Sequence, residues 1–177
     1  MVKSEKIWIN EGYLVFAKKG PEANKIERLA KSLGRNKSSF YYYFATQDIF
    51  TGELVSSHLI RIRLMAEKIQ KIIKREDLIK ILLQHHIDLL FNKQLRIHRI
   101  NSQFENCVVK TNELVRDAIM PIWKNIIGLQ NQPYLARLVL RLSAENFFLR
   151  ITEDNFNALW LQNYFNELAQ LIRELKK

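Results

Sequence analysis

Side-chain groups that can hydrogen-bond to a nucleic acid are concentrated in residues 24–46. Hydroxyl, amide and ammonium groups there stand next to consecutive tyrosines, and such groups bind phosphate oxygens and base edges. Two alternatives stay open. Helical phase favours a core position for Tyr43, and Lys37 and Arg28 could be ordinary surface charges. The candidate residues for a nucleic-acid surface are Asn24, Arg28, Asn36, Lys37, Ser38, Ser39, Tyr41, Tyr42 and Thr46.

The net charge of +10 is unevenly distributed along the chain. Residues 1–75 hold 15 Lys and Arg against 7 Asp and Glu, a net +8, whereas residues 76–177 hold 13 against 11, a net +2. A basic lobe on a nearly neutral remainder indicates a polyanionic partner, and DNA, RNA or an anionic membrane would each fit. On charge alone, a basic surface that only keeps the protein soluble fits equally well.

Apolar residues recur at three- and four-residue steps, and no strand alternation stands out, so we expect an all-α fold of about nine helices. Asn24, Asn36 and Thr46 are suitable N-caps for the second, third and fourth helices. Pro121 predicts a kink or break near Ala118. The expected helices cover about 4–19, 25–33, 37–43, 47–74, 76–91, 93–109, 112–127, 133–150 and 153–175.

Residues 26–43 have the spacing of a helix-turn-helix. Ala30 is small where the second helix of the motif must cross, and Gly34 follows where the turn favours a left-handed backbone. Leu29, Leu33 and Phe40 are spaced to hold the two helices together. The helix at 37–43 would then project its polar groups into a major groove.

Several features of this region follow one another without a gap: Phe16, Gly20, Leu29-Ala30, Gly34, the string Phe40-Tyr41-Tyr42-Tyr43-Phe44, and Thr46. In this order they resemble the N-terminal domain of TetR-family transcriptional regulators, and the match covers residues 8–50. The sequence departs from the family pattern at Asn24, Arg35, Ser38 and Gln47. Gln47 replaces a common Lys, and losing one such phosphate contact flattens the salt dependence of binding by about one unit of slope.

The resemblance implies a DNA-binding domain at 1–47 and a helical regulatory and dimerisation domain at 48–177. It also implies a ligand. Aromatic side chains with a few polar groups suit a small apolar one, although ordinary core packing explains the same residues. The candidate pocket residues are His86, Phe91, Phe104, Cys107, Trp123 and Phe147.

The last two helices are apolar over more than one face, which predicts pairing with a second copy in a four-helix bundle. Packing of both faces within one chain is the alternative. The expected dimer interface comprises Leu135, Leu138, Val139, Leu142, Leu159, Trp160, Phe165 and Leu168. The implied function is a homodimeric regulator, a repressor released by the ligand. The alternative is a helical dimeric adaptor without sequence-specific DNA binding.

Other functions lack a sequence signature. No glycine-rich phosphate loop or nucleophile motif is present, so we expect no enzyme activity and no cofactor. The adjacent His85 and His86 face different sides of a helix, and His58 and His98 stand alone, so we expect no metal site. A single cysteine excludes a disulfide within the chain. No apolar run approaches the length of a membrane span, and we expect a soluble, cytoplasmic protein without a membrane partner.

Overall fold

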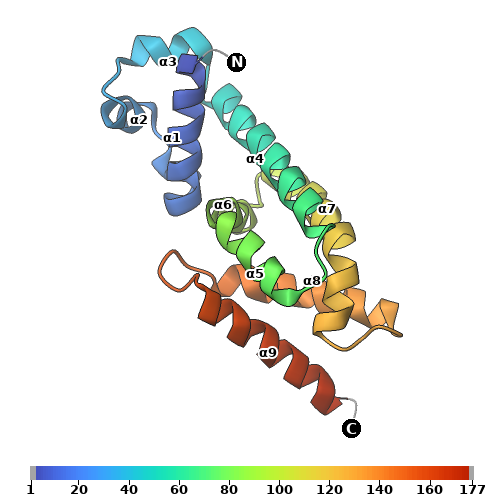
Figure 1. Cartoon of the computed structure of the whole chain (residues 1–177). Helices are drawn as coiled ribbons and strands as arrows, with labels where there is room; N and C mark the ends of the chain where they lie inside the picture. Colours follow the sequence, from blue (N-terminus) through green and yellow to red (C-terminus); the bar gives the residue numbers. More distant parts are fainter. Residues whose placement is uncertain (1–2, 176–177) are drawn as a thin grey trace. The chain divides into compact units, whose positions relative to one another are not determined.

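A computed structural model describes residues 3–175 (Figure 1). Within this range the chain is entirely helical, with nine α-helices, a short 3-10 segment and no strand, which confirms the all-α prediction. The elements are α1 Lys3–Lys19, η1 Pro21–Ala23, α2 Ile26–Ser32, α3 Lys37–Tyr43, α4 Gln47–Ile69, α5 Arg75–Gln84, α6 His86–Ile97, α7 Ser102–Ile126, α8 Pro133–Arg150 and α9 Ala158–Leu175.

The chain forms two compact units. The first unit extends to Arg61 and also includes Ile87–Lys110, and the second comprises Ile62–His86 and the chain from Thr111 onward. Helices α4 and α7 therefore contribute residues to both units. This division reflects packing, and the functional boundary expected between residues 47 and 48 stays a prediction.

Aromatic side chains form the interior of the first unit. Trp8 of α1 meets the edge of Phe40 of α3 with ring centroids 5.4 Å apart. Farther along α1, Phe16 stacks on Phe91 of α6 at 4.1 Å. All four rings are almost fully buried, and such large rings bury the most apolar area per residue. Helix α1 is thus the element on which α3 and α6 pack.

Two glycines of the first unit occupy positions where a side chain would clash or strain the backbone. A Cβ atom on Gly12 would lie only 2.4 Å from the ring of Phe50, so α4 can approach α1 only where this side chain is absent. Gly34 has φ 60°, a left-handed conformation that costs glycine little. This value confirms the left-handed turn predicted between α2 and α3.

Helices α8 and α9 of the second unit are joined by polar and aromatic contacts. Tyr164 Oη donates a hydrogen bond to the Ser143 carbonyl at 2.6 Å, and Arg150 pairs with Glu167 at 3.0 Å. The Phe147 ring meets Tyr164 at 5.6 Å. These contacts attach α9 to α8 through one face and leave other faces of both helices exposed.

Some predicted helix limits are wrong. The stretch expected as one helix at 76–91 is interrupted at His85, whose φ and ψ of −104° and 22° lie outside helical values. Helix α7 is continuous from Ser102 to Ile126, so the boundary expected between residues 109 and 112 is wrong. Of the kink or break expected near Ala118, a break is excluded, because Pro121 lies inside the helix. Pro121 and Asp117 one turn earlier are both exposed, so the Asp117 carbonyl that loses its hydrogen-bond donor lies on the solvent side.

The last helix begins later than predicted. Hydrogen bonds between the backbone and side chains of Thr152 and Asn155 hold this segment in a turn instead. The Thr152 amide donates to Asn155 Oδ1 at 2.8 Å, and the Asn155 amide donates to Thr152 Oγ1 at 3.1 Å. Asn157 then caps α9 by accepting from the Trp160 amide at 3.0 Å. Side chains of this type favour turns and caps over helix interiors.

Candidate nucleic-acid interface

Helix α3 presents polar groups on one side and buries the other. Asn36 caps it by accepting a 2.9 Å hydrogen bond from the Ser39 amide, as predicted. Phe40 is fully buried, whereas Tyr41 and Tyr42 are 53% and 82% exposed. Ser38 is also exposed. The buried ring holds the helix in place, and the opposite side is available for contacts.

The middle of α3 is held by its neighbours. The Trp8 indole donates to Ser39 Oγ at 3.3 Å, so this hydroxyl is already bonded within the protein. Tyr43 is half-buried and meets the Tyr42 ring edge-on at 4.9 Å. Ser39 is therefore engaged with α1 and Tyr43 is partly covered, whereas Tyr42 has the most accessible aromatic surface of this helix.

Lys37, at the start of α3, is paired with a carboxylate. Its Nζ lies 2.7 Å from Glu27 Oε1 of α2, and both side chains remain more than half exposed. The hydrogen bond raises the pKa of Lys37 and lowers that of Glu27. Each group therefore keeps its charge at neutral pH, but the two charges offset one another beside the candidate DNA surface.

Asn24 does not belong to that surface, which corrects two predictions. Its side chain is buried and donates to the Gly12 carbonyl at 2.9 Å, and the residue that caps α2 is Lys25, without a side-chain cap bond. Gln47 in turn donates to the Asn24 carbonyl at 2.8 Å. These bonds tie the start of α4 and the segment before α2 to α1.

Two further expected contacts lie on exposed positions. Thr46 is exposed and caps α4 through a 3.2 Å bond from the Ile49 amide, as predicted. Arg28 is exposed on α2. Exposure is what a contact residue requires, and the predicted role of these side chains in binding DNA stays a prediction.

A buried polar network joins α1, α4 and α6 and has no signal in the sequence. Tyr13 Oη donates to Asp88 Oδ1 at 2.8 Å and lies 2.7 Å from His58 Nδ1. A hydroxyl has one hydrogen to donate, so His58 Nδ1 must carry the proton and donate to Tyr13. His58 Nε2 then accepts from Asn92 Nδ2 at 3.3 Å, and Asn92 Oδ1 accepts from Arg96 Nε at 3.1 Å.

Burial keeps the His58 imidazole and the Tyr13 hydroxyl of this network uncharged. Desolvation lowers the pKa of His58 to about 3, so the imidazole is neutral at physiological pH. Burial and the neighbouring Asp88 raise the pKa of Tyr13 well above its usual value. Arg61 lies 3.5 Å from Asp88 Oδ1, and its guanidinium stands 4.4 Å from the centre of the Tyr13 ring. Asp88 thus has a positive partner close by.

The six residues expected to line a ligand pocket fall in both units. Phe91, Phe104 and Cys107 are buried in the first unit. The other three belong to the second unit, where His86 is exposed. Trp123 is buried, and its indole donates a hydrogen bond to the Ala136 carbonyl at 3.0 Å. Phe147 is half-buried among aromatic rings.

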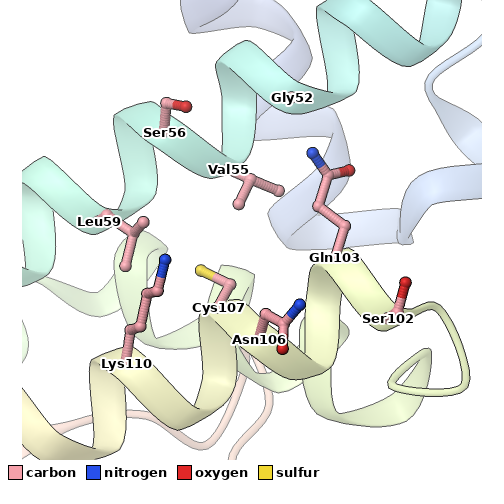
Figure 2. Close-up of a pocket in the computed structure, with 9 residues that line it drawn as sticks. All are labelled: Gly52, Val55, Ser56, Leu59, Ser102, Gln103, Asn106, Cys107 and Lys110. Carbon is pink, nitrogen blue, oxygen red and sulfur yellow. The ribbon is translucent and has the colours of Figure 1, made fainter.

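A hollow in the first unit lies between α4 and α7, and Cys107 is the one predicted pocket residue that lines it (Figure 2). Its volume is about 390 Å³. Its lining, Gly52, Val55, Ser56, Leu59, Ser102, Gln103, Asn106, Cys107 and Lys110, is more polar than the predicted pocket.

The expected dimer residues are exposed to different degrees. Leu142 and Leu159 are 61% and 66% exposed, whereas Phe165 is buried within its own unit and is a wrong prediction for an interface. It lies on the inward face of α9, next to the buried Tyr164. The remaining expected residues are half-buried: Leu135, Leu138, Val139, Trp160 and Leu168. Whether these residues meet a second copy stays a prediction.

Neither a cluster of metal-ligating side chains nor a membrane-spanning helix is found within residues 3–175. There, no three His, Cys, Asp or Glu side chains are grouped so that they could hold a metal ion. None of the helices in residues 3–175 combines the length and apolar character needed to cross a membrane.

The arrangement of a capped helix-turn-helix packed on α1, followed by longer helices, defines a TetR-like fold. A solved structure described as a putative TetR-family transcriptional regulator from Mesorhizobium loti is similar, with a TM-score of 0.56 and 14% sequence identity. The similarity covers 99% of this chain and 98% of that one. No protein-family model and no curated protein matches the sequence. The similarity therefore establishes the fold.

Proposed function

We propose that this protein is a transcriptional regulator that binds double-stranded DNA through α3. The observation that carries the proposal is the arrangement of this helix. It is capped by Asn36, held by the buried Phe40, and exposes Lys37, Ser38 and Tyr42 together. A helix held in this way can enter a major groove, where hydroxyl and ammonium groups contact bases and phosphates. The net charge of +8 on residues 1–75 supports attraction to DNA.

The proposal includes a homodimer formed by α8 and α9. Leu142 and Leu149 of α8 and Leu159 and Leu171 of α9 are each more than half exposed. Pairing of these faces with a second copy would remove the leucines from water. A twofold dimer would also present two α3 helices to two half-sites about one helical turn apart, roughly 34 Å.

We further propose that the protein is a repressor that a small ligand releases from DNA. This part rests on the TetR-like fold and on the hollow between α4 and α7. Helix α4 begins at Gln47, which bonds to the segment before α2, so movement of α4 would shift the support of the helix-turn-helix. A ligand shifts such an equilibrium only if it binds one arrangement more tightly.

A dimeric adaptor without sequence-specific DNA binding is the second candidate. Two observations favour it: Glu27 offsets the charge of Lys37, and Gln47 donates to the protein backbone. The ion pair reduces the positive charge that Lys37 offers to phosphates, and the neutral Gln47 amide is already bonded within the protein. Under this reading the exposed tyrosines would contact another protein.

Sequencing of DNA fragments selected by the purified protein tests the proposal. We expect one enriched sequence made of two half-sites, bound in a salt-sensitive manner. Tyr42→Ala should weaken binding to it at least tenfold with an unchanged melting temperature, because this ring is exposed. Ile73→Ala is the control, since Ile73 lies between α4 and α5, outside α3, α8 and α9, and is 83% exposed. Absence of any enriched sequence, or equal losses in both variants, would favour the adaptor.

A further inference from the structure

The hollow between α4 and α7 has one charged side chain and a ring of neutral polar groups. Figure 2 shows the Lys110 side chain extending from α7 toward α4, next to Leu59 and Cys107. No carboxylate lines the hollow, and none of the described residues forms an ion pair or hydrogen bond with Lys110. Its ammonium is therefore a cation open to an anionic partner.

The other lining residues supply two further kinds of contact. Val55 and Leu59 of α4 form an apolar wall. Ser56, Ser102, Gln103 and Asn106 supply hydroxyl and amide groups along the rim. The hollow opens to solvent, because Lys110 and these rim residues are exposed, and its volume of about 390 Å³ admits a small molecule. An apolar wall beside a single ammonium favours a molecule with one negative end and an apolar remainder.

The Cys107 thiol adds no second charge to the hollow. Burial raises the pKa of Cys107 to about 12, against a smaller opposing effect of the Lys110 ammonium. The thiol is therefore uncharged at neutral pH and acts as part of the apolar wall. The local charge of the hollow is that of Lys110.

We propose that this hollow binds a small organic monoacid, with its carboxylate on Lys110 and its apolar part against Val55 and Leu59. The regulatory consequence rests on the proposed function, but the binding itself does not. The ligand class differs from the purely apolar molecule expected from the aromatic residues, because the lining contains no aromatic ring.

Helix α4 connects the hollow to the helix-turn-helix, because it lines the hollow and its first residue bonds to the segment before α2. A Cβ atom on Gly52 would lie 3.4 Å from Gln103 Nε2, so α4 and α7 are close at this point. Gln47, little more than one turn before Gly52, donates to the Asn24 carbonyl. A ligand that moves α4 relative to α7 within this unit would alter that bond.

Titration of the full chain by two-dimensional amide NMR, without DNA, tests the binding. The probes are benzoate, octanoate and inorganic phosphate at constant ionic strength. We expect the two carboxylates to shift amide signals of residues 52–59 and 102–110, and phosphate to leave them unchanged. Lys110→Gln should weaken carboxylate binding by about threefold to fivefold, since it removes a charge-assisted hydrogen bond from an exposed ammonium.

Lys124→Gln is the matched control, because it removes the same charge from the same helix, outside the hollow. The proposal is wrong if neither carboxylate binds in the millimolar range, if phosphate binds equally well, or if Lys110→Gln binds like the unaltered protein. A separate measurement of DNA release by the carboxylates distinguishes the two proposals. Binding of the acids by a protein that does not bind DNA would contradict only the proposed function.

Discussion

The ion pair between Glu27 and Lys37 leads to a prediction about the salt dependence of DNA binding. Glu27 Oε1 lies 2.7 Å from Lys37 Nζ, at the end of α3 that would enter the groove. Glu27→Gln keeps an oxygen that can accept the same hydrogen bond but removes the negative charge. We therefore expect tighter binding to every DNA sequence, with an unchanged order of preference among sequences.

The size of the effect follows from counterion release. One additional lysine that neutralises a phosphate steepens the plot of log affinity against log salt by about 0.9, so a fourfold rise in salt costs about 3.5-fold more affinity. A homodimer carries two copies of the pair. The expected change is then a slope steeper by about 1.8, and about twelvefold more affinity lost over the same range.

Fluorescence anisotropy with one labelled duplex, measured from about 50 to about 200 mM salt, provides the slope. Glu22→Gln is the control, because it makes the same charge change on an exposed residue in η1, before α2. An unchanged slope in Glu27→Gln, or an equal change in both variants, would refute the reasoning. Lys37 would then be a surface charge remote from the bound DNA.

Three further predictions concern stability and assembly. Asn36→Ala removes the cap of α3 and should lower the free energy of unfolding by about 1 kcal/mol in urea titrations, and an unchanged midpoint would contradict the observed cap. The pKa of His58 is about 3 in the folded chain against about 6.5 when unfolded, so the unfolded state binds more protons as pH falls. Stability from this group is complete above about pH 6.5 and should fall by up to about 1.4 kcal/mol per pH unit below it, a slope that His58→Asn should remove. Leu142→Glu places a charge on the exposed face of α8 and should convert the proposed dimer to monomers in sedimentation velocity, whereas a dimer that persists would exclude this face.

Features that depend on neighbours along the chain were predictable from the sequence. The cap at Asn36, the left-handed Gly34 and the exposure of Tyr41 and Tyr42 follow from residue type and helical phase over a few positions. The all-α class follows from the same periodicity. The interruption at His85 was not predictable, because apolar residues continue on both sides of it.

Contacts between distant residues were decided by the tertiary structure. Asn24 has the type of a cap residue, yet its side chain bonds to the Gly12 carbonyl, and Phe165 continues an apolar face that packs inward. Tyr13 bonds to His58, 45 positions away, and to Asp88, 75 positions away. Periodicity determines which face of a helix a residue occupies, but only the packing of helices determines which groups then meet there.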